Sequence, residues 1–287
     1  MDTQFLESYV AVVDCGSMAE AARRLDLTAA AVAARVKSLE ESLGTVLLRR
    51  AGRTVKATEA GLRILDHSRG VLRDVRNLQA MAQDDASPGE LRLGASTSSL
   101  TGVVAPLLRS LYQRMPGLAV YIEPGNSALL YQRVTSGMLD AAVIVQPQFT
   151  LPKSCDWQAL VDEPLCVLAP ASMAGRDPLE LLSTEPFIRY DRSMWGGRMA
   201  DTYLRERHIQ PRERIEIDAL NAIAVFVDQG LGVSLVPDWT PPWPEGLKLL
   251  KLQLPGPVPV RRLGLVWTAG PRAALARALL GEMKPAG

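Results

Sequence analysis

Short runs of hydroxyl and amide side chains in the C-terminal two thirds of the chain follow expected strands and precede expected helices. Hydroxyls together with the free backbone N–H groups at a helix N-terminus form a site for an anion. A hydroxyl that serves only as a helix cap explains the same pattern, and capping and binding do not exclude each other. The first set of candidate effector-binding residues is Ser96, Thr97, Ser98, Ser99, Asn126 and Ser127.

A second set lies farther along the chain, beginning with the expected strand at residues 187–190. An arginine that faces hydroxyls across a cleft binds a carboxylate, and a tryptophan covers an apolar or aromatic part of a ligand. The opposing interpretation is an arginine-rich surface with Trp195 in the core. Together the two sets predict a small organic anion as the ligand. The second set is Arg189, Tyr190, Trp195 and Asn221.

Positive charge is concentrated near the N-terminus, although the 287-residue chain has a net charge of only +1. Between Arg23 and Lys56 there are eight Lys or Arg against three Asp or Glu, which indicates one basic face. Arg49, Arg50 and Arg53 lie in a turn between two short expected strands. Arginines in such a turn bind phosphates or enter a minor groove, and the opposing interpretation is a merely solvated turn.

The sequence contains none of the common signatures of an enzyme or a metal site. It has no G-x-S-x-G elbow, phosphate-binding loop or dinucleotide fingerprint, and its three cysteines and two histidines show no metal-ligand spacing. We therefore expect no catalysis, no cofactor and no metal. Cys166, inside an apolar run, is expected to be a buried, unreactive thiol. Sparse cysteines, no signal peptide and no run of about 18 apolar residues predict a cytoplasmic protein without membrane contact.

Residues 1–57 have the pattern of a compact helical module with a short β-wing. Ser17 and Glu20 have the spacing of a capping box, and Thr28 can cap the helix that follows. That helix has a single apolar stripe and ends at Gly44, as expected of a glycine just past a helix end. Two short strands, 46–48 and 54–56, then enclose the arginine turn.

Residues 58–87 are expected to form one long amphipathic helix that begins at the capping residue Thr58. A long helix with one apolar stripe usually pairs with a partner helix, although packing on its own chain stays open. From residue 90 onward, strands alternate with helices, which predicts two α/β lobes built on parallel sheets with helices on both faces. Ligands in such folds bind at the carboxyl ends of the strands.

The N-terminal part of the chain carries a specific pattern of residue types and spacings. In this pattern the chain resembles the LysR-type transcription regulators, and segments 140–144 and 230–237 are also similar to segments of that family. The pattern consists of Phe5-x3-Tyr9-x6-Gly16-Ser17-x3-Ala21-Ala22-x2-Leu25, Leu39-Glu40-x2-Leu43-Gly44-x2-Leu47-Leu48-x-Arg50 and Thr58-Glu59-Ala60-Gly61.

The resemblance implies a bacterial α/β regulator with a winged helix-turn-helix at 1–57, a linker and dimerisation helix at 58–87 and an effector-binding domain at 88–287. That domain is expected to have two lobes, similar to periplasmic binding proteins, with lobe I at about 90–162 and 267–287 and lobe II at about 163–266. Expected partners are double-stranded DNA, a small-molecule effector, a second copy through the linker helix, further copies in a homotetramer, and RNA polymerase.

The expected recognition helix, residues 29–43, departs from the family pattern. The family commonly has polar residues where this chain has Ala29 and Ala33, and alanine cannot form the bidentate hydrogen bonds that distinguish base pairs. We expect methyl contacts, Arg35 and DNA shape to set sequence choice; the alternative is a ligand sensor with a degenerate, non-DNA-binding helix-turn-helix. The candidate DNA-binding residues are Ser17, Thr28, Ala29, Ala30, Ala33, Ala34, Arg35, Lys37, Arg49, Arg50 and Arg53.

Overall fold

The computed structural model of the chain describes residues 2–52, 54–81, 90–270 and 273–281. It divides into two compact units, Met1–Gly89 with Ser136–Met138, and Glu90–Thr135 with Leu139–Gly287. Arg53 and the predicted end of the linker helix, residues 82–87, lie outside the described residues. Within the described ranges, no helix is long and apolar enough to cross a bilayer.

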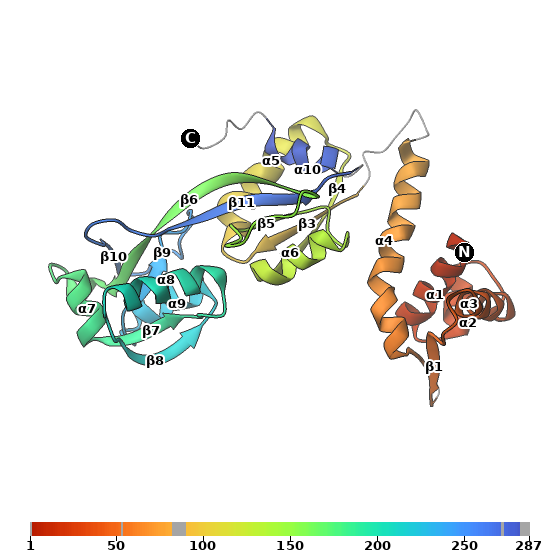
Figure 1. Cartoon of the computed structure of the whole chain (residues 1–287), viewed down its shortest axis with the longest axis horizontal. Coiled ribbons are helices and arrows are strands. Elements are labelled where there is room, and N and C mark those ends of the chain that lie inside the picture. The colour runs from red at the N-terminus through yellow and green to blue at the C-terminus, as the bar shows by residue number, and fades with distance from the viewer. Residues whose placement is uncertain (1, 53, 82–89, 271–272, 282–287) are drawn as a thin grey trace. The chain divides into compact units, whose positions relative to one another are not determined.

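The N-terminal unit is the expected helical module with a wing (Figure 1). Its helices enclose a core that includes Tyr9, Val12 and Leu39, and the two wing strands pair antiparallel. The first wing strand begins at Leu48 and not at the predicted residue 46, so Arg49 and Arg50 lie within this strand and not in the predicted turn. The elements are α1 Thr3–Cys15, α2 Met18–Arg24, α3 Ala29–Leu43, β1 Leu48–Ala51, β2 Thr54–Ala57 and α4 Glu59–Met81.

Most of the predicted helix ends in this unit have the expected chemistry. Thr28 Oγ1 accepts a hydrogen bond from the Ala31 amide at 3.1 Å, and Thr58 Oγ1 accepts one from the Gly61 amide at 3.0 Å. Gly44 ends α3 with a left-handed φ of 65°. The capping box was wrong: Ser17 precedes α2 but makes no side-chain cap hydrogen bond.

The wing is attached to α3 by one carboxylate. Glu40 Oε1 accepts hydrogen bonds from the backbone amides of Leu47 at 2.7 Å and Leu48 at 3.1 Å. These are charge-assisted bonds, which are stronger than bonds between neutral groups. Because Glu40 belongs to α3, it fixes the position of β1 relative to that helix.

Replacing Glu40 by alanine is expected to release the start of the wing. The Leu47 and Leu48 amides lose an acceptor worth about 2 kcal/mol, so their hydrogen exchange should accelerate about 30-fold. Exchange of these amides, measured by NMR in the full chain, checks the expectation. Glu41→Ala is the matched control, because Glu41 is exposed and pairs with the exposed Lys37 at 3.7 Å. Equal exchange in the two variants would contradict the anchoring role.

The C-terminal unit alternates strands and helices, as expected, but contains more strands than the sequence predicted. Its first elements are β3 Glu90–Ser96, the π-helix η1 Leu100–Val104, α5 Ala105–Arg114, β4 Ala119–Gly125, α6 Ser127–Thr135, β5 Ala141–Val145 and β6 Cys155–Pro170. The remaining elements are η2 Ala171–Met173, α7 Pro178–Thr184, β7 Pro186–Tyr190, α8 Trp195–Glu206, β8 Arg212–Ile217, α9 Leu220–Asp228, β9 Ser234–Pro237, β10 Leu249–Gln253, β11 Val260–Thr268 and α10 Ala273–Leu280.

The sheets are mixed and not purely parallel. A seven-stranded sheet has the order β10-β6-β11-β5-β3-β4, with β9 also paired to β6, and β7 pairs with β8 in a second sheet. Strands β3, β4 and β5 are parallel, as are β7 and β8, whereas β11 runs antiparallel to both β5 and β6. The long strands β6 and β11 lie side by side and join the two lobes of this unit (Figure 1).

Each lobe has its own core. In the first lobe α5 and α10 pack on one face of the sheet and α6 on the other. In the second lobe α8 and α9 contribute to two further clusters. Leu263 and Leu265 of β11, which the sequence analysis placed in lobe II, pack in the first-lobe core. The chain therefore returns to the first lobe earlier than residue 267.

Candidate functional sites

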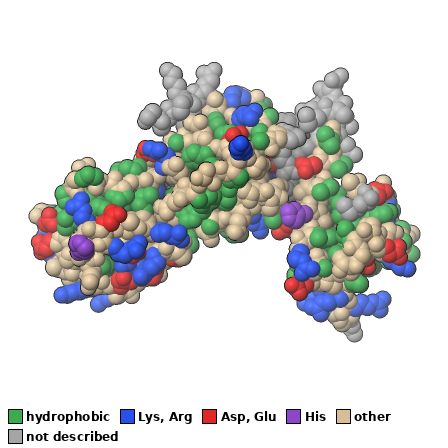
Figure 2. Space-filling view, viewed as in Figure 1, with side chains coloured by type: hydrophobic (Ala, Val, Ile, Leu, Met, Phe, Trp, Pro, Cys, Tyr) green, Lys and Arg blue, Asp and Glu red, His purple; other side chains and the backbone are tan. Residues whose placement is uncertain are grey.

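A groove of about 640 Å³ on the N-terminal unit lies between α3, the start of α2 and the wing. Figure 2 shows Lys and Arg side chains gathered at the wing end of this unit, where Arg49 and Arg50 are exposed. Thr28, Ala30, Ala34 and Arg35 do not line the groove. The predicted DNA-binding residues that do line it are Ser17, Ala29, Ala33, Lys37, Arg49 and Arg50.

Arg35 is held by the first helix. Its Nη2 donates a hydrogen bond to Gln4 Oε1 at 2.7 Å. The residue is partly buried, whereas Ala30 and Ala34 on the same helix are exposed. Arg35 therefore lies on the flank of α3, and its partner Gln4 has no signal in a single sequence.

A cavity of about 250 Å³ lies in the C-terminal unit, where four strands end and four helices begin. The junctions are β3 to η1, β4 to α6, β7 to α8 and β8 to α9, so both lobes contribute. This is the edge at which α/β folds bind ligands. The predicted effector-binding residues that line the cavity are Ser96, Thr97, Ser98, Asn126, Ser127, Tyr190, Trp195 and Asn221.

Two of the predicted serines, Ser96 and Ser99, have different surroundings. Ser96 is 9% exposed, and its Oγ has no hydrogen-bond partner among the described residues. Ser99 is fully buried, and its Oγ donates to the Ser96 carbonyl at 2.8 Å. Ser99 therefore stabilises the turn and, contrary to prediction, is not part of the lining. A buried hydroxyl without a partner is costly, and Ser96 itself belongs to the cavity lining.

Asn126 and Ser127 combine the structural and the lining role. Asn126 Oδ1 accepts from the Leu129 amide at 2.9 Å, which caps α6. Ser127 Oγ accepts from the Val145 amide at 3.1 Å. Both side chains are thus fixed by backbone donors while they line the cavity.

The other helix starts at the cavity lack such caps. Ser99, Met194 and Ala219 precede η1, α8 and α9, and none of these three makes a side-chain cap hydrogen bond. The first N–H groups of a helix have no partner within the helix and carry partial positive charge. Helix starts around one cavity therefore give it a potential that favours an anion.

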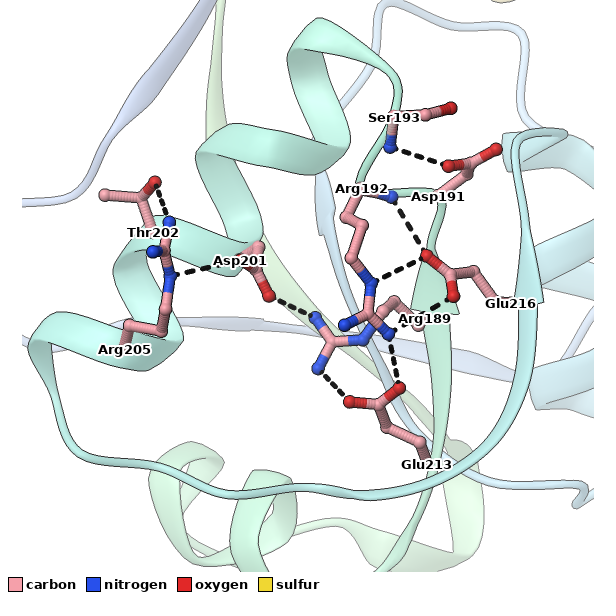
Figure 3. Close-up of polar contacts among 9 residues, drawn as sticks. All are labelled: Arg189, Asp191, Arg192, Ser193, Asp201, Thr202, Arg205, Glu213 and Glu216. Atoms are coloured by element: carbon pink, nitrogen blue, oxygen red, sulfur yellow. Dashed lines mark hydrogen bonds and ion pairs between the residues drawn. The ribbon is translucent and has the colours of Figure 1, made fainter.

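Arg189 does not reach the cavity, which corrects its predicted role as a carboxylate clamp. Successive residues of a strand point to opposite faces, and on β7 it is Tyr190 that lines the cavity. Arg189 Nη1 lies 2.9 Å from Asp201 Oδ1 and Nη2 lies 2.6 Å from Glu213 Oε1 (Figure 3). The hydrogen bond from Arg189 lowers the pKa of Glu213 and keeps that carboxylate charged. The guanidinium is thus already neutralised.

The arginine at the cavity is Arg261 of β11, which sequence reasoning missed. It is 1% exposed, and its Nε donates to Glu163 Oε2 at 2.8 Å. Tyr190 lies against it, and burial raises the pKa of the Tyr190 hydroxyl. The sequence signal that could have identified Arg261 is a charged residue within an apolar strand. The signal was missed because the strand β11 itself was not predicted.

Trp195 lines the cavity and contacts a further aromatic side chain outside the lining. The Phe149 ring is 5.8 Å from the Trp195 ring and 5.2 Å from the Tyr131 ring, both edge-on. Phe149 is nonetheless 49% exposed.

Away from the cavity, Cys166 is buried as predicted, and burial raises its pKa to about 12, which disfavours the reactive thiolate.

Comparison with known proteins matches both units. Residues 84–286 match the LysR substrate binding domain, and residues 3–62 match the bacterial regulatory helix-turn-helix protein of the lysR family. The HTH-type transcriptional activator CmpR of Synechocystis sp. is 29% identical, over 80% of this chain and 77% of its own length. The RuBisCO operon transcriptional regulator of Allochromatium vinosum is 27% identical, over 80% and 78%. Full-length CbnR, complexed with its target DNA, has a similar fold, with a TM-score of 0.69 over 98% of both chains at 20% identity.

A winged helix-turn-helix joined to a two-lobed ligand-binding unit defines a DNA-binding transcription regulator with an effector domain, and not an enzyme. The two family models together cover nearly the whole sequence. The chain belongs to the LysR family of transcription regulators. The alternative of a sensor with a degenerate helix-turn-helix finds no support in these matches.

Proposed function

We propose that this regulator binds a small organic anion in the interlobe cavity and that the bound anion controls transcription. The observation that carries the proposal is the gathering of uncapped helix starts around the unpartnered Ser96 Oγ. An anion satisfies both the free N–H groups and this hydroxyl. Arg261 adds a cationic group, although Glu163 balances its charge.

The aromatic ring of Trp195 favours an anion with an apolar or aromatic portion. Trp195 lines the cavity and presents an edge-on contact to Phe149. Ligand sites combine such surfaces with a few well-placed polar groups. In this arrangement the acidic end of the ligand lies at the starts of η1 and α9 and its apolar end at Trp195, on α8.

We further propose that copies of the chain pair through α4. This helix exposes Val71 and Leu78 by 42 and 65% in the single chain; they are seven residues apart and so share one face, which a partner helix would cover. Assembly into a homotetramer, contact with RNA polymerase and a cytoplasmic location in bacteria accompany this proposal, because they suit a DNA-binding member of this family.

Thermal denaturation of the full chain with a panel of aliphatic and aromatic carboxylates tests the ligand class. A carboxylate at 100 times its Kd should stabilise the wild type by about 2.7 kcal/mol. Ser96→Val should lose most of this stabilisation, because it removes the available hydroxyl. Ser183→Val is the matched control, since Ser183 is exposed on α7. The proposal fails if no carboxylate acts on the wild type, or if Ser96→Val responds as the control does.

A further inference from the structure

The exposed face of α3 consists of methyl groups. Ala29, Ala30, Ala33 and Ala34 are all exposed, while Val32, Val36 and Leu39 are buried on the opposite side. With about 3.6 residues per turn, the four alanines form one continuous patch over the first two turns. We define these four residues as the alanine face.

Polar side chains are almost missing from this part of the helix. In residues 29–37 the side chains that can form hydrogen bonds are Arg35 and Lys37. Arg35 lies on the flank beside the buried side and is held by Gln4 at 2.7 Å. Thr28, just before the helix, uses its hydroxyl as the cap. Lys37 is exposed and acts as a flexible point charge, which does not supply bidentate geometry.

The wing contributes to the affinity for DNA but does not distinguish one base pair from another. Arg49 and Arg50 are exposed at the groove, and Glu40 fixes the wing to α3. Arginines in this position bind phosphates, which positions the protein but does not report sequence directly. Direct readout therefore falls to the alanine face.

The major groove offers one feature that an alanine can recognise, the C5-methyl group of thymine. A pyrimidine methyl that packs against an alanine methyl forms a favourable apolar contact. A polar base edge that faces alanine instead loses its hydrogen bonds to water without gaining a partner. Small side chains also let the helix approach the bases closely.

We infer that the alanine face of α3 reads pyrimidine 5-methyl groups, so that it prefers thymine and accepts 5-methylcytosine in its place. The inference rests on the DNA-binding function of the helix-turn-helix. It assigns to the protein a sensitivity to base methylation, because a methylated C·G pair presents the same methyl as a T·A pair.

The test uses duplexes selected from a random library by the full-length protein. Fluorescence anisotropy compares the selected duplex with one in which deoxyuridine replaces thymidine, which removes the methyl and keeps base pairing. Affinity should fall about fourfold for each contacted methyl, the factor expected for burial of one such group. Replacing a contacted T·A by C·G should weaken binding, and replacing it by 5-methyl-C·G should restore much of the loss.

Two variants locate the effect on the protein. Ala33→Gly, with its folding checked by circular dichroism, should reduce the penalty for deoxyuridine. Arg49→Ala should weaken binding to both duplexes by the same factor and leave the penalty unchanged. Binding that is equal on thymidine and deoxyuridine duplexes overturns methyl reading while leaving DNA binding intact. Failure to bind any duplex at low salt overturns both.

Discussion

Replacing Glu163 by alanine is expected to lower the free energy of unfolding of the C-terminal unit by about 3–5 kcal/mol. Glu163 and Arg261 are each 1% exposed, so the variant leaves a buried guanidinium without its counter-charge. Glu163 Oε1 also accepts from the Thr240 amide at 2.8 Å and from Thr240 Oγ1 at 3.1 Å. Both sets of bonds are lost together.

Urea denaturation followed by tryptophan fluorescence measures this effect selectively, because all five tryptophans lie in the C-terminal unit. The double variant Glu163→Leu/Arg261→Met should recover a large part of the loss, since no charge then stays buried. Asp162→Ala is the control: Asp162 is the neighbouring strand residue and pairs with Arg262 on the exposed side. A loss below 1 kcal/mol for Glu163→Ala would contradict the role of the pair.

The double variant Arg49→Ala/Arg50→Ala is expected to weaken DNA binding by roughly tenfold for each arginine, about the strength of one charged hydrogen bond. It should also reduce the slope of log K against log salt by about 1.8, because two phosphate contacts no longer release counterions. The measurement is a salt titration of affinity for one duplex.

Arg205→Ala serves as the control for net charge, because Arg205 is exposed on α8 in the other unit. It should leave the salt slope unchanged. If the wing variant keeps the wild-type slope, Arg49 and Arg50 do not contact phosphate, and these two arginines of β1 are only solvated.

The N-terminal unit was predictable because its signals are local. A helix cap such as Thr28 or a terminating Gly44 acts within a few residues, and the apolar stripe of α3 repeats every turn. The failed capping box at Ser17 has a local cause too. Glu20 pairs with Arg23 within its own helix, a competition that spacing alone does not resolve.

The C-terminal unit was harder to predict, because charged residues of one strand form ion pairs with residues of a neighbouring strand that is distant in the sequence. The middle of β6 carries Asp162 and Glu163, two charged residues that suggest an exposed segment when the strand is considered alone. Their partners Arg262 and Arg261 lie about a hundred residues away. Likewise, the sequence identified the segment with Arg189 and Tyr190 but not which of the two faces the cavity. Strand parity depends on tertiary packing that a single sequence does not reveal.

The placement of β11 between β5 and β6 has a consequence for synthesis. Since β11 and α10 come after the second lobe in chain order, the first-lobe core stays without Leu263, Leu265 and α10 until residues 260–280 have left the ribosome. The second lobe, by contrast, is almost entirely made before then. The nascent chain therefore holds an incomplete sheet with an unpaired strand edge at this stage, and such edges are prone to aggregation.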